Sequence, residues 1–180
     1  MHSRVKPLPD VNEIDKLSSK PLEQLTLKQL EDLAKCYYEG SGGLHKDTHK
    51  AFTIWQEGVA KGSSECKYSV ASCLRNGEGL VEDSETEEEE KKQQRKDERL
   101  KGALQIFQEL ADSFEFKPVL QDTSKYDASV EQKSIRDQVE PYKANIQAQY
   151  ALAVMYENGE GTEINHEIAF KYFKLAAQGK

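Results

Sequence analysis

The sequence has few cysteines and no long apolar run. Its three cysteines, Cys36, Cys66 and Cys73, form no Cys-x-x-Cys pair, so we expect no metal site, no disulfide and a reducing compartment. No apolar stretch approaches the roughly 20 residues that span a bilayer, and residues 1–16 contain no apolar signal region. We therefore predict a cytoplasmic protein without a membrane span, and a mitochondrial location is also compatible with the sequence.

The sequence has fewer basic than acidic residues, with 25 lysines and arginines against 32 aspartates and glutamates. The chain carries a net charge of -7, whereas nucleic-acid binding needs clustered lysine and arginine, so nucleic acid is not expected as a partner. The hydrophobic fraction is 37% and the charged fraction 32%, which predicts either segments outside the core or a fold with a large surface. A length of 180 residues suits one domain.

A short glycine motif recurs three times. Its glycines are Gly40 and Gly42, Gly77 and Gly79, and Gly159 and Gly161. Apolar or tyrosine residues stand seven, six and three places before the first glycine: Leu33, Ala34 and Tyr37; Val70, Ala71 and Leu74; and Leu152, Ala153 and Tyr156. This spacing predicts a helix before each motif, with these residues in its buried stripe.

A second helix is predicted after each motif. A polar stretch ends in Asp47, Asp83 or Asn165, residue types that cap helix N-termini. An alanine and apolar residues at helical spacing follow: Ala51, Phe52, Trp55 and Val59; Ala103, Leu104, Phe107 and Ala111; and Ala169, Phe170, Phe173 and Ala177. The alanine lets paired helices approach closely and the aromatic residue fills the space between units. Each unit therefore reads as helix, glycine corner, helix.

The glycine motif is not expected to hold a phosphate. A phosphate-binding loop follows a strand and carries a third glycine or a Gly-Lys-Ser/Thr ending. A predicted helix precedes Gly159 instead, and the further glycine and lysine are absent. The first glycine can end a helix in the left-handed conformation, and the second lets the chain reverse without a side-chain clash. We therefore predict three structural corners.

The repeated pattern resembles the Sel-one-like repeat family, which is related to the tetratricopeptide repeats. The stretches that carry the resemblance are ECKYSVASCLRNGEGL and AQYALAVMYENGEG, with KAFTIWQEGVAKG and IAFKYFKLAAQG as matching second helices. Together the three units cover roughly 100 residues. The resemblance implies an all-α fold, a short right-handed α-solenoid of about three helical hairpins, here with two charged insertions.

The expected organisation is an N-terminal arm and one repeat domain. Residues 1–25 contain three prolines and little periodicity, so we expect a flexible arm. The repeat domain then covers 26–180, and Thr26 with Gln29 can form a capping box at its first helix. The repeats are placed at about 27–62, 63–112 and 146–180, with insertions at 84–99 and 113–145.

The two insertions differ in expected structure. Residues 84–99 either form a solvated helical extension, supported by Glu87–Lys91 and Glu88–Lys92 pairs, or a disordered charged loop. In residues 113–145, FEFKPVL is expected to be extended, and a short polar helix is expected to begin near Asp127 or Ser129.

No catalytic, cofactor-binding or metal-binding residues are predicted. His45 and His49 are four apart but lie on either side of the predicted cap at Asp47, so we expect exposed histidines and no shared metal. Cys66 and Cys73 are expected to be small core residues. Because helical-hairpin solenoids offer binding surfaces more often than enclosed pockets, we predict a protein that is not an enzyme. An enzyme with an unrecognised site is the third hypothesis.

The leading functional hypothesis is a non-catalytic adaptor or assembly factor that holds another protein or peptide segment. The resemblance implies that the first helices line the concave binding face. Residues two and five places before the first glycine should point away from the paired helix. The predicted partner contacts are therefore Lys35, Tyr38, Ser72, Arg75, Val154 and Glu157.

The alternative hypothesis is a structural subunit that docks through its C-terminal helix. In EIAFKYFKLAAQGK the apolar residues, among them Phe170 and Phe173, spread over most of the helix circumference. Solenoid ends need polar capping surface. We therefore expect a partner protein, a second copy of the chain or one of the insertions to cover this helix. The chain could equally be part of a longer repeat protein.

Overall fold

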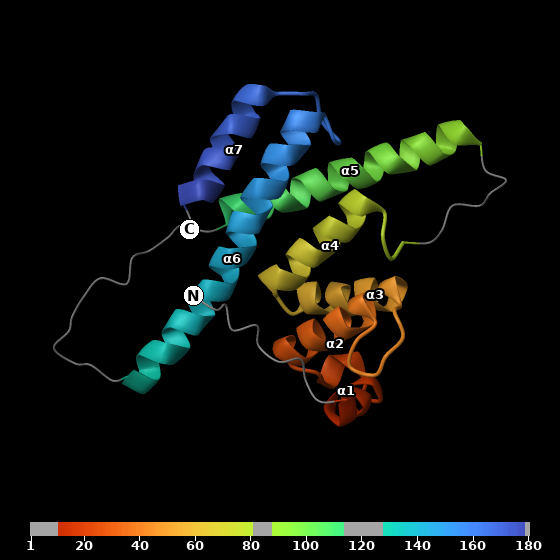
Figure 1. Ribbon diagram of the computed structural model, residues 1–180, viewed down its shortest axis with the longest axis vertical. Coiled ribbons are helices and arrows are strands. Elements are labelled where there is room, and N and C mark those ends of the chain that lie inside the picture. Colours follow the sequence, from red (N-terminus) through yellow and green to blue (C-terminus); the bar gives the residue numbers. More distant parts are fainter. Residues whose placement is uncertain (1–10, 81–87, 114–127, 179–180) are drawn as a thin grey trace. The chain divides into compact units, whose positions relative to one another are not determined.

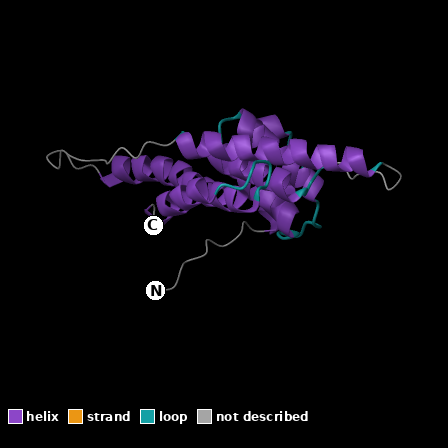
Figure 2. Cartoon of the chain, turned by 90° about the horizontal axis from the view of Figure 1, so that it is seen from above, coloured by secondary structure: helices purple, strands orange, loops and turns teal. Residues whose placement is uncertain are grey.

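The computed structural model describes residues 11–80, 88–113 and 128–178, with the backbone alone for residues 128–141. Every regular element in these ranges is a helix (Figure 2), which confirms the predicted all-α class. The chain divides into two compact units, with the boundary after Ser84.

The described part of the first unit, residues 11–80, contains five helical elements, which Figure 1 shows in red to yellow. They are α1 (Val11–Ser18), the short 3-10 helix η1 (Leu22–Gln24), α2 (Leu27–Glu39), α3 (Thr48–Ala60) and α4 (Ser64–Asn76). α2 packs on α1 and α3, and α3 packs on α4. The first predicted repeat is therefore the α2–α3 hairpin.

Three helices lie in the described part of the second unit. They are α5 (Glu89–Asp112), α6 (Ala128–Asn158) and α7 (His166–Gln178), and α6 packs against both of the others. The third predicted repeat is the α6–α7 hairpin. The two helices predicted for the second repeat, α4 and α5, belong to different units.

The predicted apolar stripes form the cores of both units. Six of the nine stripe positions are buried, namely Leu33, Ala34, Val70, Ala71, Leu152 and Ala153, and the third member of each set is half-buried. The alanines of the second helices, Ala51, Ala103 and Ala169, are buried as predicted, as are Trp55 and Phe107. Phe173 is half-buried. Hydrophobic burial at helical spacing therefore explains both hairpins.

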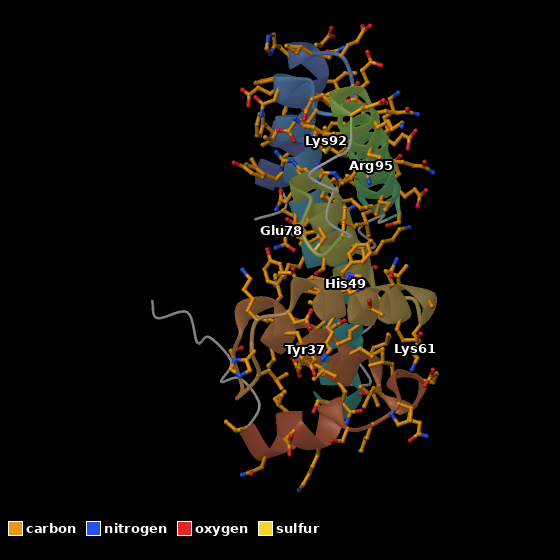
Figure 3. All side chains as sticks on the ribbon, turned by 90° about the vertical axis from the view of Figure 1, so that its right-hand side faces the viewer. Tyr37, His49, Lys61, Glu78, Lys92 and Arg95 are labelled. Atoms are coloured by element: carbon orange, nitrogen blue, oxygen red, sulfur yellow. The ribbon has the colours of Figure 1, made fainter. Side chains whose placement is uncertain are left out.

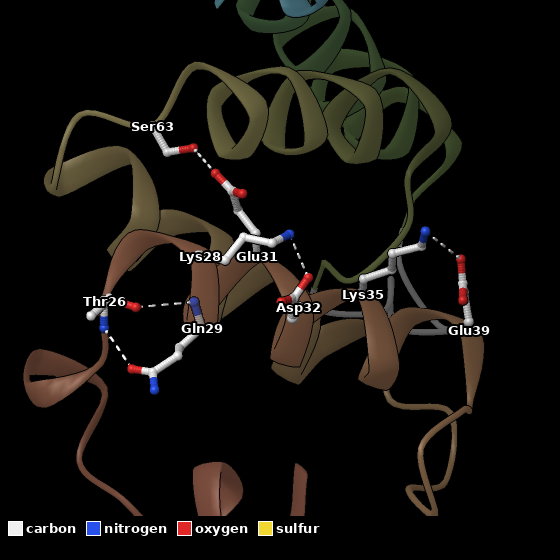
Figure 4. A network of polar contacts seen from close by, with 8 residues as sticks. All are labelled: Thr26, Lys28, Gln29, Glu31, Asp32, Lys35, Glu39 and Ser63. Carbon is white, nitrogen blue, oxygen red and sulfur yellow. Dashed lines mark hydrogen bonds and ion pairs between the residues drawn. The ribbon is translucent and has the colours of Figure 1, made fainter. Parts of the chain in front are cut away.

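Helix starts are fixed by side-chain caps. Thr26 and Gln29 form the predicted capping box at α2 (Figure 4), because the Thr26 hydroxyl accepts from the Gln29 N–H and the Gln29 side chain accepts from the Thr26 N–H. Asp47 and Asn165 cap α3 and α7 as predicted, at 2.9 and 3.0 Å. Asp83 lies outside the described residues. A further cap is Ser63, which accepts from the Cys66 N–H at the start of α4.

The first glycine of each motif ends a helix. Gly40, Gly77 and Gly159 have φ values of 70°, 79° and 71°, in the left-handed region where a side chain is disfavoured. The amide that follows each glycine donates back to a carbonyl five residues earlier, at 3.0, 3.0 and 2.9 Å. This is the Schellman type of helix termination. The predicted corners are therefore confirmed.

The second glycine lets the corner lie against an earlier helix. A Cβ at Gly79 would overlap the Thr48 carbonyl oxygen of α3, and one at Gly161 would lie 2.6 Å from the Leu100 carbonyl carbon of α5. Real Cβ atoms do not approach other atoms so closely, so only glycine fits. Sequence reasoning assigned this glycine to chain reversal alone, whereas the structure also gives it a packing role.

The N-terminal segment differs from the expected flexible arm over residues 11–25. α1 buries Ile14 and Leu17, which are 0% and 4% exposed, because this short apolar stripe packs on α2. η1 is held by Lys61, the residue that follows α3 (labelled in Figure 3). Its Nζ donates to the carbonyls of Leu22, Glu23 and Leu25 at 2.8–3.1 Å. Residues 1–10 of the predicted arm lie outside the described residues.

Both insertions contribute helix. Residues 89–99 are the first three turns of α5, so the helical alternative holds for this part of the 84–99 insertion, and Lys92 and Arg95 extend from it (Figure 3). Among the described residues this segment has the ion pairs Glu88–Lys91 and Glu89–Lys92, at i and i+3, so Glu88 pairs with Lys91 and not with the predicted Lys92. Glu87 and the FEFKPVL stretch lie outside the described residues.

The helix expected near residue 127 does not end before the third repeat. α6 runs without a break from Ala128 to Asn158. Asn145 stands fourteen residues before Gly159, the position that Thr26 and Ser63 hold before Gly40 and Gly77. Those two cap helix starts, whereas Asn145 lies inside α6 and donates to the Leu110 and Ala111 carbonyls at the end of α5, at 2.9 and 2.8 Å. This tertiary capping replaces a local one.

We expect Gly79→Ala to destabilise the first unit more than Gly62→Ala does. Both glycines have positive φ, 72° and 90°, so each alanine meets a backbone cost of about 1–2 kcal/mol. A Cβ at Gly62 meets nothing within 4 Å, whereas at Gly79 it adds an overlap of about 1–3 kcal/mol. Urea unfolding measures the difference. Equal losses of unfolding free energy in the two variants would contradict the packing role of Gly79.

We expect Asn145→Ala to lower the unfolding free energy by about 1–3 kcal/mol. Asn145 is only 4% exposed, and without its amide the Leu110 and Ala111 carbonyls at the end of α5 each lose a buried donor. The matched control is Gln105→Ala, which removes an exposed amide that donates to Glu109 on α5 and should change the free energy by less than about 0.5 kcal/mol. Equal effects in urea unfolding would show that Asn145 does not join α6 to α5.

Candidate functional site

The described residues show no arrangement suited to catalysis by a thiol or a metal. No group of three or more His, Cys, Asp or Glu side chains that could hold a metal occurs in the part of the chain that the structure describes. Burial raises the pKa of both Cys66 and Cys73 to about 11, and Cys36 is also buried with a raised pKa. Protonated, buried thiols are poor nucleophiles and poor metal ligands.

His45 and His49 do not form a pair on one helix. His45 lies in the corner between α2 and α3, His49 lies in the first turn of α3, and both side chains are exposed, as predicted. The Nδ1 atom of His49 is 3.1 Å from the Gly79 carbonyl oxygen. His49 therefore contributes to the contact between α3 and the second glycine corner.

The six predicted contacts on the first helices are unevenly accessible. Lys35 and Glu157 are exposed, and Lys35 lies 3.7 Å from Glu39 on the same helix. The other members of the set, Tyr38, Ser72, Arg75 and Val154, are half-buried. They lie on α2, α4 and α6, so the structure divides the set between the two units.

Tyr38 does not point away from its paired helix as expected. Its ring centroid lies 5.3 Å from that of Trp55 on α3. Its hydroxyl donates to Glu78 Oε2 at 2.5 Å, and this hydrogen bond, with burial, raises the pKa of Tyr38 to about 12. The side chain therefore joins the first hairpin to the second glycine corner.

Large apolar side chains are exposed on the α6–α7 hairpin. Tyr150 of α6 is 59% exposed, Ile164 of the corner 61%, and Phe170 and Leu175 of α7 are 70% and 38% exposed. We call these four residues the α6–α7 apolar surface. Phe173 lies beside them, with its ring 5.6 Å from that of Tyr150 in an edge-to-face arrangement. A stacked pair, Tyr156 and Tyr172, joins the two helices at 6.1 Å.

The sequence predicted part of this surface. Phe170 was expected from the wide apolar circumference of the last helix, and its exposure agrees with that expectation. Tyr150 and Ile164 were missed because neither belongs to the repeated stripe. Tyr150 stands nine places before Gly159, where the first repeat has Glu31 and the second has Tyr68. Because one repeat holds a charged residue there, comparison with Glu31 indicates that this position can lie at the surface.

The described residues include no helix that is both long and apolar enough to cross a membrane. Charged residues interrupt α5 between Glu89 and Lys101 and α6 between Glu131 and Lys143.

Comparison with known proteins identifies the repeats. The family model of the Sel1 repeat matches residues 30–63 and 146–180. No curated relative matches the chain. The family model does not match residues 64–112 of the predicted second repeat. This part of the chain contains the 84–99 insertion, which includes the first turns of α5.

Two solved structures are similar to the chain. The crystal structure of a Sel1 repeat protein from Oxalobacter formigenes has a TM-score of 0.57 and 15% identity, covering 98% of this chain and 94% of that one. The second is c5321, a protective antigen of uropathogenic Escherichia coli with an SLR fold, at a TM-score of 0.38 and 15% identity, covering 93% of this chain and 33% of that one. The second likeness is too low to support an argument.

At 15% identity the first likeness shows the fold alone. It agrees with the helical hairpins, the left-handed glycine corners and the two family matches. These features involve the same residues that carry the resemblance in the sequence. The chain therefore contains Sel1 repeats, at residues 30–63 and 146–180, within the all-α solenoid fold predicted from its sequence.

Proposed function

We propose that the chain is a non-catalytic scaffold that binds another protein through the α6–α7 apolar surface. The observation that carries this proposal is the exposure of Phe170, which is 70% accessible although its counterpart Phe52 in the first repeat is half-buried. Contiguous exposed apolar side chains in a folded protein commonly mark an interaction site. Sel1 repeats typically serve as protein-binding scaffolds, which supports the same function.

The chemistry of the surface favours a polypeptide partner. Tyr150, Ile164, Phe170 and Leu175 supply apolar area, and Glu157, Glu163 and Glu167 are exposed around them. An apolar centre with a charged rim is the usual composition of a protein–protein interface. The aromatic rings of Tyr150 and Phe170 are of the residue types that contribute most to binding energy, as hot spots do.

The adaptor face predicted on the first helices is a second candidate. Lys35 and Glu157 are exposed on it, whereas Tyr38 is engaged with Trp55 and Glu78 within the first unit. A partner that used Tyr38 would have to compete with these contacts. The α6–α7 apolar surface is therefore the stronger proposal, and the remaining predicted contacts on the first helices stay predictions.

The test compares proteins retained by the tagged full chain and by two double variants. Phe170→Asp with Tyr150→Asp places charge on the apolar surface, and Lys35→Ala with Ser72→Ala alters the first-helix face. Because Phe170, Tyr150 and Lys35 are exposed and Ser72→Ala removes a half-buried hydroxyl, the melting temperatures should stay close to that of the native chain. We expect the first variant, and not the second, to lose specific polypeptides in quantitative mass spectrometry, by about tenfold for an interface hot spot.

Equal retention by the native chain and the Phe170/Tyr150 variant would contradict the proposed surface. Selective loss in the Lys35/Ser72 variant would assign binding to the first-helix face instead. Each lost polypeptide is then purified and its affinity measured directly, so that a lysate capture alone does not decide the result.

A further inference from the structure

One junction recurs through the described repeats. The second glycine of a corner lies against an earlier helix: Gly42 against Ile14 of α1, Gly79 against Thr48 and Phe52 of α3, and Gly161 against Leu100 of α5. Thr48 and Leu100 hold the same repeat position, three places before Ala51 and Ala103. This position on the second helix of a repeat therefore forms the surface on which a following glycine corner packs. We call it the acceptor position.

α7 carries the same repeat positions, and within the described residues no glycine corner contacts them. His166 stands three places before Ala169, and Phe170 corresponds to Phe52. Both side chains are exposed, whereas Gly159 contacts its own corner and Gly161 contacts α5. The exposed ring of Phe170 thus marks a position that, in the first repeat, a following corner covers.

The first unit also shows where the N-terminus of a helix lies when that helix packs on the hairpin before it. Ser63, the N-cap of α4, donates to Glu31 Oε1 at 2.7 Å (Figure 4). Glu31 stands nine places before Gly40, and Tyr150 stands nine places before Gly159. A helix that docked on the α6–α7 hairpin would therefore place its N-cap near Tyr150 and its glycine corner near Phe170.

The first repeat differs from the others, because the glycine corner after α2 packs on α1, which belongs to no repeat. The corner of the first repeat packs on α1, with the Gly42 position 3.1 Å from Ile14 and the Gly43 position 2.8 Å from Val11, measured from an added Cβ. α1 has eight residues and buries only Ile14 and Leu17, and Val11 is 54% exposed. α1 therefore occupies the place of a second helix with a much smaller apolar contact than the thirteen residues of α3 or α7 can offer.

We infer that the α6–α7 hairpin of one molecule docks on the first repeat of a second copy, in the place of α1. This rests on the proposed function, since it names the partner of the α6–α7 apolar surface. The incoming α2 would set Thr26 near Tyr150 and the Gly42 corner on His166 and Phe170. Because the donor and acceptor surfaces differ, the contact is head-to-tail.

Charge supports the same pairing. The corner of the first repeat exposes Lys46, whereas Glu157, Glu163 and Glu167 are exposed at the acceptor end of the α6–α7 hairpin. Opposite charge favours encounter and correct register. In the first unit Lys61 holds η1 to α3 through three carbonyls, so α1 can leave while the segment before α2 stays in place. α1 is thus an internal competitor of self-association.

Sedimentation of the full chain tests the inference. Ile14→Asp with Leu17→Asp removes the two buried anchors of α1 and should make self-association at least about tenfold tighter than in the native chain, because the competent state no longer has to displace α1. Adding Phe170→Asp should restore the monomer. Gln105→Asp is the matched control, since it places the same charge at an exposed position of α5 outside the α6–α7 apolar surface and should leave the association unchanged.

A folded Ile14/Leu17 variant that stays monomeric on the order of 100 µM, a concentration at which even weak specific contacts are populated, would overturn the inference. So would an association that persists with Phe170→Asp.

A disulfide trap in the native background decides the case if the α1 variant does not fold. Ser63 and Glu31 form a hydrogen bond across the same junction in the first unit. The corresponding intermolecular pair is Thr26 and Tyr150, and both side chains are exposed. A Thr26→Cys chain mixed with a Tyr150→Cys chain should form a mixed disulfide, whereas Thr26→Cys mixed with Lys101→Cys should not.

Equal yields of the mixed disulfide from the two mixtures would contradict the head-to-tail contact. The three native thiols are buried, which keeps the background low. If the Phe170/Tyr150 variant loses other polypeptides but neither self-association nor the disulfide is observed, the proposed binding surface stands and only its assignment to a second copy fails.

Discussion

The structure depends on the absence of a Cβ atom at the second glycine of each corner. At Gly79 and Gly161 that missing atom lets a chain reversal lie directly on the backbone of an earlier helix, at Thr48 and Leu100. Interiors are close-packed, so a single extra carbon at such a contact separates the elements on either side. The packing of each of these corners on an earlier helix depends on this close approach, and Phe170 of α7, at the repeat position of Phe52, is exposed.

Much of this architecture could be predicted from the sequence because its causes are local. The stripe of Leu33 and Ala34 and its two repeats follow helical spacing, and the caps at Thr26, Asp47 and Asn165 depend on residues within the same turn. The left-handed conformation of Gly40 likewise depends only on the end of α2. Three copies of each local pattern made the prediction of helical hairpins specific.

Other parts could not be predicted because tertiary contacts decide them. Ile14 and Leu17 are too few to indicate a helix in a proline-containing segment, and α1 is held by its contact with α2. Asn145 has the residue type and repeat position of an N-cap, yet α6 passes through it because the carbonyls at the end of α5 accept its amide. In the candidate site, Phe170 was predicted, whereas Tyr150 required comparison with Glu31 at the same position, and Tyr38 turned to Trp55 instead of solvent.

The most direct test of the glycine contacts is a nuclear Overhauser spectrum of the native chain. The hydrogen that replaces the missing side chain at Gly79 points toward the Cβ of Phe52, and that at Gly161 toward the Lys101 amide. The account predicts strong cross-peaks for both pairs and none between the Phe170 ring and any corner glycine in the monomer. Absence of the Gly79–Phe52 and Gly161–Lys101 cross-peaks would contradict it.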